Sequence, residues 1–418
     1  MLALQVSQQN FPGLGNSLPV AILFLLHITV AEYSLGAITL ASAFEWRALR
    51  TGDPRELRYS RAAANSYYLV FSLGATLAVF AVVLLIGLWS NEFGTLANIL
   101  LPLFATAFGL FLVLAPLLVV YRNTTGSMAP LRHAVLGSAV AALQTLFMFL
   151  IVGLDAYLIT PSHGGLLEAS LNPAYWPLLA HRLIGNVSWT ALFLAAYAAV
   201  KLRWSRDAEE RAFQGWAARV NLRIGLVTAL LMPIGGFALM LVLQGSQLGY
   251  FDNLVQGSTA WMMVLQEAFL AIVLVGGNVA LGAEAGWSGE RRDAVALPAT
   301  LVTLAGMVVA ALPSSVLPGS VEWIRLVGLG VAMLVTAVHL VARWRPQPRT
   351  DAQRAGSPSA AAQRIAPQSL VVVGTFALLL SLLMGVVKES ARGTYAVYGE
   401  MTQGQAQQHF NPPGNLYP

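Results

Sequence analysis

The chain has 418 residues, of which 57% are hydrophobic and 10% are charged, and its mean hydropathy is +0.66. Soluble domains carry about 25% charged residues, so this composition indicates a membrane protein with many spans. The sequence has no cysteine, which excludes disulfides, cysteine-ligated zinc, iron–sulfur clusters and covalently attached c-type haem. The net charge of +5 comes from basic residues spread over short loops, so no nucleic-acid partner is expected.

A spanning helix needs about 20 mainly apolar residues, and about ten stretches meet that condition. They predict an all-α polytopic membrane bundle with spans near 18–45, 62–88, 97–121, 132–158, 174–201, 216–244, 258–284, 292–312, 319–343 and 368–388. Lys and Arg gather in alternate connections, whereas the connections 88–97, 159–173 and 245–257 contain none. Because positive loops favour the cytoplasm, we expect a multi-pass protein of the bacterial inner membrane with both termini on the periplasmic side.

The sequence also predicts how the chain is divided. Residues 1–344 form the transmembrane bundle of the first nine helices, and residues 368–388 form an accessory tenth helix. Residues 345–367 are rich in Pro, Ala, Gln and Arg without an apolar period, which is typical of a flexible cytoplasmic linker. Residues 389–418 form an external tail that is expected to order only against a neighbour.

Ionisable side chains inside spans are costly, so each is a candidate for function. His181 lies about seven residues, or roughly 10 Å, into the fifth span, and Gly185 and Ser188 follow it on the same helix face. Small residues beneath a histidine leave room for a flat macrocycle, as a haem ligand requires. A histidine that bonds a nearby carbonyl group is an equally good interpretation of the local sequence.

Three further side chains lie at a comparable depth. His27 in the first span is also followed by small residues, although on its own it favours a structural role. Met262 and Met263 lie in the outer half of the seventh span. A thioether is a known axial haem ligand opposite histidine, but methionine is also a common core filler.

The remaining charged and titratable residues of the spans have open interpretations. Arg182 either extends to the outer interface or pairs with a haem propionate. Glu267 is protonated, pairs with another helix, or carries protons, and a structural role is favoured. His133 and His339 lie near cytoplasmic helix ends and are expected to be interfacial.

Three segments resemble subunit I of the cytochrome bd quinol oxidases. The run HITVAEYSLGAITLASAFEWRALRTG, which starts at His27, resembles the first helix of that family; AVLGSAVAALQTLFMFLIVGLDAYLITP resembles the fourth, and LLAHRLIGNVSWTALFLAAY the fifth. The resemblance covers residues 18–284. It implies that His181 ligates a low-spin b haem with Met262 or Met263 opposite it, and that His27 serves a second haem.

Departures from the family pattern shift the expected function. The third span, 97–121, has no acidic residue, the connection 245–257 stands in place of a long external quinol-binding loop, and the eighth span has no Glu. We therefore expect a divergent member that keeps one or two b haems and lacks the oxygen-reducing site and catalytic residues. It would pass electrons between the quinone pool and a periplasmic c-type cytochrome or iron–sulfur subunit of a respiratory complex.

Three other functions stay open. The first is a haem-free structural anchor of such a complex, the second is a bd-type quinol oxidase with rearranged ligands, and the third is a transporter. A transporter predicts broken helices at matching places in two halves, and Pro116 and Pro233 do not form such a pair. Quinone binding is an open question for all of the redox functions.

Overall fold

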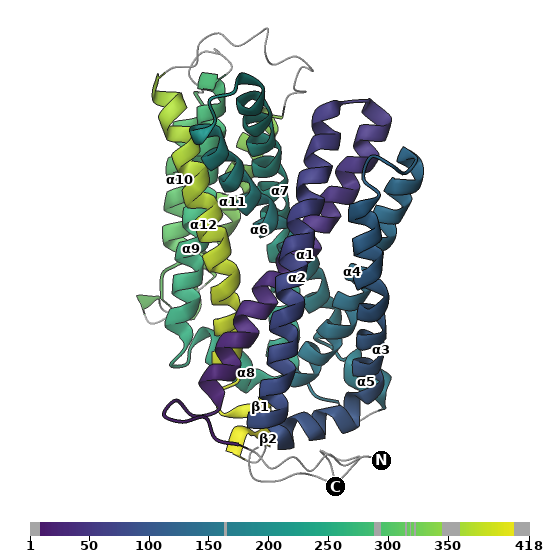
Figure 1. The fold of residues 1–418 in the computed structure, drawn as a ribbon. Coiled ribbons are helices and arrows are strands. Elements are labelled where there is room, and N and C mark those ends of the chain that lie inside the picture. The colour runs from purple at the N-terminus through teal and green to yellow at the C-terminus, as the bar shows by residue number, and fades with distance from the viewer. Residues whose placement is uncertain are drawn as a thin grey trace. The chain divides into compact units, whose positions relative to one another are not determined.

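The computed structural model describes residues 9–162, 165–287, 294–313, 316–317, 319–321, 323–344 and 360–404. These residues are mostly helical (Figure 1). The helices are α1 (Ser17–Thr51), α2 (Pro54–Leu88), α3 (Ser90–Asn123), α4 (Pro130–Ile159), α5 (Leu166–Ser170), α6 (Tyr175–Trp204), α7 (Ala208–Ser246), α8 (Leu248–Val255), α9 (Ala260–Trp287), α10 (Ala296–Ala310), the 3-10 helix η2 (Gly319–Val321), α11 (Ile324–Ala342) and α12 (Ala360–Ala391).

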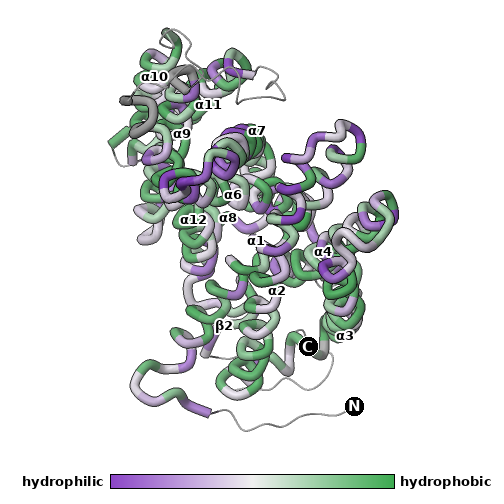
Figure 2. Tube along the Cα trace, turned by 45° about the horizontal axis from the view of Figure 1, so that its top comes forward, coloured by the Kyte–Doolittle hydropathy of each residue, from purple (hydrophilic) through white to green (hydrophobic). Residues whose placement is uncertain are grey.

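Within the described ranges, nine helices are long and apolar enough to cross a membrane. The tenth predicted span, 292–312, contains the shorter apolar helix α10, which has 15 residues. Figure 2 shows hydrophobic residues along most of the length of the helices. Large apolar side chains such as Phe80 and Phe108 are 58% and 63% exposed, which suits contact with lipid and not with water. The prediction of an all-α, multi-pass membrane bundle is confirmed.

The chain forms two compact units, and each is described by itself. Unit 1 comprises Met1–Leu183, Ile234–Asp252 and Lys388–Pro418, and unit 2 comprises Ile184–Pro233 and Asn253–Val387. Residues 345–359 of the predicted linker lie outside the described residues, and its last part belongs to the start of α12. The predicted division into a bundle (1–344), a linker (345–367), an accessory helix (368–388) and a tail (389–418) stays a prediction.

In unit 1, α1 packs against α2 and α4, and α3 packs against the same two helices. Glycines let helix backbones approach each other closely in membrane proteins. A Cβ added at Gly74 of α2 would lie 3.0 Å from Val30 Cγ1 of α1, and a Cβ added at Gly137 of α4 would lie 2.8 Å from the Tyr121 ring of α3. The backbones of α1 and α2 therefore come close together at Val30, one helical turn after His27.

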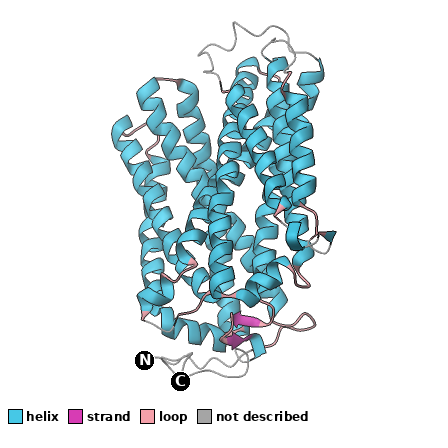
Figure 3. Cartoon of the chain, turned by 180° about the vertical axis from the view of Figure 1, so that it is seen from behind, coloured by secondary structure: helices cyan, strands magenta, loops and turns pink. Residues whose placement is uncertain are grey.

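A short hairpin follows α12 in unit 1. The strands β1 (Tyr395–Val397) and β2 (Met401–Thr402) pair antiparallel, with Val397 opposite Met401 (Figure 3). The Tyr398 backbone N–H donates to the Leu158 carbonyl oxygen of α4 at 3.0 Å. Part of the predicted tail 389–418 is thus ordered against α4.

In unit 2, α10 packs against α9 and α11 around a buried amide. Asn278 Nδ2 of α9 donates to the hydroxyl oxygens of Thr303 and Thr336 at 3.2 and 2.8 Å. Asn278 Oδ1 lies 2.8 Å from His339 Nδ1. Interhelical hydrogen bonds of this kind are worth about 0.6 kcal/mol each on average in a membrane, so their main effect is to fix which helix faces meet.

The crossing of α10 and α11 leads to a stability prediction. A Cβ added at Gly328 would lie 2.5 Å from the Gly306 carbonyl oxygen, whereas one added at Gly330 of the same helix meets nothing within 4 Å. We expect Gly328→Ala to lower the free energy of unfolding by about 1–3 kcal/mol because backbone atoms must move apart. Thermal unfolding in detergent measures it, with Gly330→Ala as the control; equal unfolding temperatures for the two variants would contradict the prediction.

Candidate functional site

His27 is a candidate ligand because one of its ring nitrogens is held and the other is available. Nδ1 lies 3.1 Å from the Gly74 carbonyl oxygen of α2. A carbonyl oxygen only accepts hydrogen bonds, so Nδ1 carries the proton, and in the neutral ring Nε2 keeps its lone pair. Among the described residues no group hydrogen-bonds Nε2 of this partly buried side chain. Metal-ligating histidines characteristically donate their other ring N–H to a carbonyl or carboxylate in this way.

His181, in the first half of α6, packs against two consecutive glycines of α7 that also belong to unit 1. A Cβ added at Gly235 would lie 2.9 Å from the His181 backbone nitrogen, and a Cβ added at Gly236 would lie 3.3 Å from Nδ1. The imidazole ring therefore rests on bare helix backbone. A larger residue at Gly235 would force the backbones of α6 and α7 apart, whereas one at Gly236 would press on the imidazole ring.

The small residues predicted to leave space beneath His181 contact α7 instead. A Cβ added at Gly185 would lie 3.2 Å from Met232 Cε, and the Ser188 hydroxyl donates to the Gly225 carbonyl oxygen at 3.0 Å. These contacts are within unit 2. Gly185 and Ser188 thus serve helix packing, and room for a flat group beside His181 has to come from another face of α6.

Met262 and Met263 lie in the first turn of α9, in unit 2, and both are partly buried. His181 belongs to unit 1. The expectation that one of these thioethers lies opposite His181 stays a prediction.

Arg182 takes part in an ion network that neither sequence interpretation named. Its Nη1 donates to the carboxylate of Asp155 on α4, and its Nη2 lies 3.7 Å from Glu32 Oε1 on α1. Lys388 Nζ, at the end of α12, donates to the other oxygen of Asp155 at 3.0 Å. Two cations and two carboxylates thus balance each other. The sequence analysis did not single out Asp155; an Asp inside a predicted span, four residues before the end of α4, is the signal that could have found this network.

A second polar cluster of unit 1 joins the C-terminal parts of α1 and α3 to the start of α4. The Tyr121 hydroxyl donates to Glu45 Oε2 at 2.8 Å, and His133 Nδ1 bonds Glu45 Oε1. His133 Nε2 lies 2.9 Å from the Tyr121 carbonyl oxygen. His133 lies in the first turn of α4 and is buried in the protein, where the carboxylate of Glu45 on α1 supplies its partner; its expected place at the membrane interface stays a prediction.

Two ion pairs join helices of unit 2. Glu267 lies 3.2 Å from Arg325 of α11, which confirms the interpretation that it pairs with another helix. Arg223 of α7 lies 2.8 Å from Glu284 of α9. His339 lies in the last turn of α11, fully buried in the protein and bonded to Asn278; its expected place at the membrane interface stays a prediction.

Glu92 is a titratable residue that the sequence interpretation placed in a loop. The helix α3 begins at Ser90 and bends at Leu100, where φ is −110° and ψ is 17°, shortly before Pro102. Glu92 therefore lies in a helical turn ahead of the spanning part, Ile99–Asn123. Its Oε2 is buried and has no hydrogen-bond partner among the residues that the structure describes, and burial raises the pKa of Glu92 to about 8, against the opposing effect of Arg392.

The network around Asp155 leads to a prediction about stability. Asp155→Asn leaves Arg182 and Lys388 without their shared carboxylate, and uncompensated buried charge costs about 3–5 kcal/mol. We expect a loss of that size in the free energy of unfolding. Glu389→Gln is the matched control, since the Glu389 side chain is 48% exposed and exposed pairs contribute about 0–1 kcal/mol. Denaturant unfolding that ranks the two variants equally would contradict the prediction.

Glu92 leads to a prediction about pH. Its pKa in the folded protein, about 8, lies above the ordinary value of 4.5, so the folded state favours the neutral acid. The stabilisation is complete below pH 4.5 and is lost as pH rises towards 8, by up to about 1.4 kcal/mol per pH unit. We expect the unfolding temperature of Glu92→Gln to depend less on pH between pH 5 and pH 8 than that of the wild type. An unchanged slope would show that other groups cause the pH dependence.

Comparison with known proteins identifies the family of this chain. The family model of cytochrome bd terminal oxidase subunit I matches residues 18–248, more than half of the chain. No curated protein matches the chain. A chain in the structure of bd oxidase from Geobacillus thermodenitrificans is similar in fold, with a TM-score of 0.53 and 15% sequence identity over 90% of this chain and 97% of that chain. The resemblance inferred from the sequence is confirmed: the chain belongs to the cytochrome bd terminal oxidase subunit I family and is a multi-pass membrane subunit of the respiratory-oxidase type.

Proposed function

We propose that the protein is a b-haem subunit of a membrane redox complex that passes electrons between the quinone pool and a periplasmic partner. Membership of the cytochrome bd subunit I family supports haem as the cofactor. Bound haem iron supplies one-electron transfer at a potential that its axial ligands set. The observation that carries the proposal is the geometry of His27.

His27 meets the two requirements of an axial ligand in this chain. The hydrogen bond from Nδ1 to the Gly74 carbonyl oxygen holds the ring orientation and the tautomer. The same bond makes Nε2 the more basic nitrogen, because a donated N–H raises ligand basicity. Gly74 permits the approach of α1 and α2 that brings the two atoms together.

His181 is proposed as the ligand of a low-spin b haem, with Met262 or Met263 as the candidates for the second ligand. The bare backbone of Gly236 beside the His181 ring supports this role because it adds no bulk next to the imidazole. Arg182 is already engaged with Asp155. We therefore propose that Arg182 acts on a nearby haem mainly through its charge.

Two helical segments without acidic residues, and a short connection between α7 and α9, support electron transfer without oxygen reduction. The spanning part of α3, Ile99–Asn123, has no Asp or Glu, and neither has α10. Between α7 and α9 the chain has only the short helix α8. We propose a c-type cytochrome or an iron–sulfur subunit as the partner at the predicted periplasmic side, and quinone as the membrane-soluble partner.

A haem-free anchor of the same complex is the second candidate. The packing of Gly185 and Ser188 against α7 favours it, because these contacts use the space that the sequence interpretation assigned to a macrocycle.

Haem counting separates the two candidates. We expect the purified chain to give a b-type pyridine haemochrome, and His27→Gly to lose one haem per chain because the iron loses its axial nitrogen. Added imidazole should restore the band if the loss is one of ligation and not of folding. His133→Gln, a histidine variant away from the site, is expected to keep the wild-type ratio of haem to protein.

The same purified protein tests the role of His181 and the proposal that the chain transfers electrons without reducing oxygen. His181→Gly should remove the low-spin band selectively, and quinol should reduce the wild-type band without oxygen uptake. A wild-type chain free of haem would establish the anchor, and quinol-dependent oxygen consumption would establish an oxidase.

A further inference from the structure

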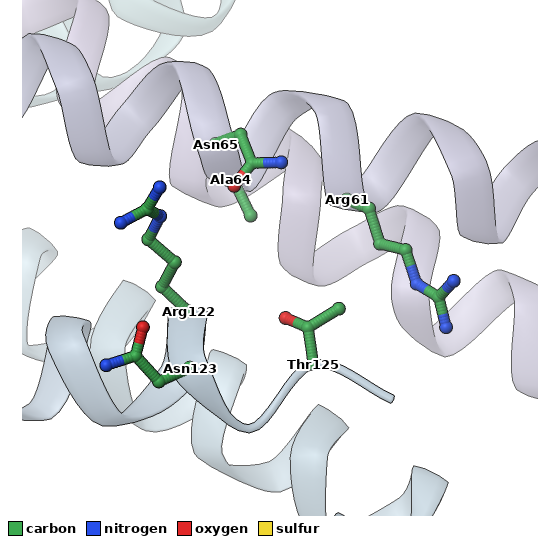
Figure 4. Close-up of a pocket in the computed structure, with 6 residues that line it drawn as sticks. All are labelled: Arg61, Ala64, Asn65, Arg122, Asn123 and Thr125. Carbon is green, nitrogen blue, oxygen red and sulfur yellow. The ribbon is translucent and has the colours of Figure 1, made fainter. Parts of the chain in front are cut away.

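A cavity of about 390 Å³ opens in unit 1 at the end of the bundle where α2 begins and α3 ends. Its walls contain two arginines, one on each helix, with small and polar side chains between them (Figure 4). The lining residues are Arg61, Ala64, Asn65, Arg122, Asn123 and Thr125. None of them is acidic, and all of the polar ones are exposed.

The two arginines are available for an anion. No carboxylate among the described residues forms an ion pair with Arg61 or Arg122, in contrast to Arg47 and Arg55 near the same helix ends, which bond Glu56 and Asp53. The Arg122 guanidinium lies 4.2 Å from the centre of the Tyr68 ring of α2. Stacking on an aromatic face orients the guanidinium and leaves its N–H donors free at the edge.

The surface that continues from the cavity towards the middle of the helices is apolar. Leu69 lies two turns beyond Arg61 on the same face of α2 and is 66% exposed. Val119 lies one turn before Arg122 on α3 and is 42% exposed. Further along, the rings of Phe71 and Phe111 stack at 5.9 Å and close the gap between α2 and α3. A polar, cationic opening above exposed aliphatic side chains matches a phosphate group with acyl chains attached.

We propose that this cavity binds the phosphate headgroup of an anionic phospholipid. Arg61 and Arg122 contact the phosphate oxygens by charge-assisted hydrogen bonds, and Asn65, Asn123 and Thr125 surround them with further donors. The acyl chains lie on the exposed aliphatic side chains of α2 and α3. Basic pockets between spanning helices on the cytoplasmic side are typical of such lipid sites, and the positive loops predict that this end is cytoplasmic.

Lipid binding by the full-length protein tests the proposal. The delipidated protein in detergent is titrated with phosphatidylglycerol, and the bound lipid is counted by native mass spectrometry. We expect Arg61→Gln/Arg122→Gln to weaken binding about 25-fold, because each basic side chain near the membrane surface contributes about 1 kcal/mol. Arg50→Gln, an exposed arginine of the last turn of α1 outside the cavity, is the control and should bind as the wild type does.

Two further arms identify the ligand. Phosphatidylcholine, which has a phosphate but no net charge, should bind much more weakly than phosphatidylglycerol, and inorganic phosphate should not displace the lipid at millimolar concentration. Equal affinity of the double variant and the wild type for phosphatidylglycerol would overturn the site. Binding of inorganic phosphate in place of the lipid would overturn its assignment to a lipid.

Discussion

A charge inside the apolar part of a membrane has to be neutralised by a partner, and for several charged side chains in the described part of this protein the partner lies on another helix. Isolated charges at membrane depth are expensive, and solvent does not screen them. Asp155 of α4 is shared by Arg182 of α6 and Lys388 of α12, and in unit 2 Glu267 of α9 is paired with Arg325 of α11. Because each pair joins two helices, charge neutralisation also selects which helices become neighbours.

The candidate haem ligand His27 differs from these paired charges, because the described residues bond only one of its two ring nitrogens. His27 satisfies one ring nitrogen with the Gly74 carbonyl oxygen and leaves the other without a partner among the described residues. An available lone pair is informative, since buried polar groups are normally bonded. Gly74 contributes to this arrangement, because a side chain at this position would press on Val30 of α1 next to the carbonyl group that His27 bonds.

Position along the membrane normal explains why, within the described part of the chain, some arginines are paired with carboxylates and others are not. Arg182 and Arg223 lie within spanning helices and are paired with carboxylates. Arg61 and Arg122 lie near helix ends, where lipid phosphates are within reach, and no carboxylate of the described residues is paired with either of them. Glu92 shows a third solution, in which burial outside the spanning segment favours the neutral acid.

The sequence by itself determined the membrane class, nearly all of the spans, the family, and His27 and His181 as residues of interest, because hydropathy and motif spacing are local properties. Tertiary structure decided the partners. Asp155 became part of an ion network, and His133 and His339, which lie near helix ends, are buried in the protein because their partners Glu45 and Asn278 lie on other helices. The contacts of Gly185 and Ser188 with α7, and the helical turn that carries Glu92, likewise depend on residues distant in sequence, which no local pattern specifies.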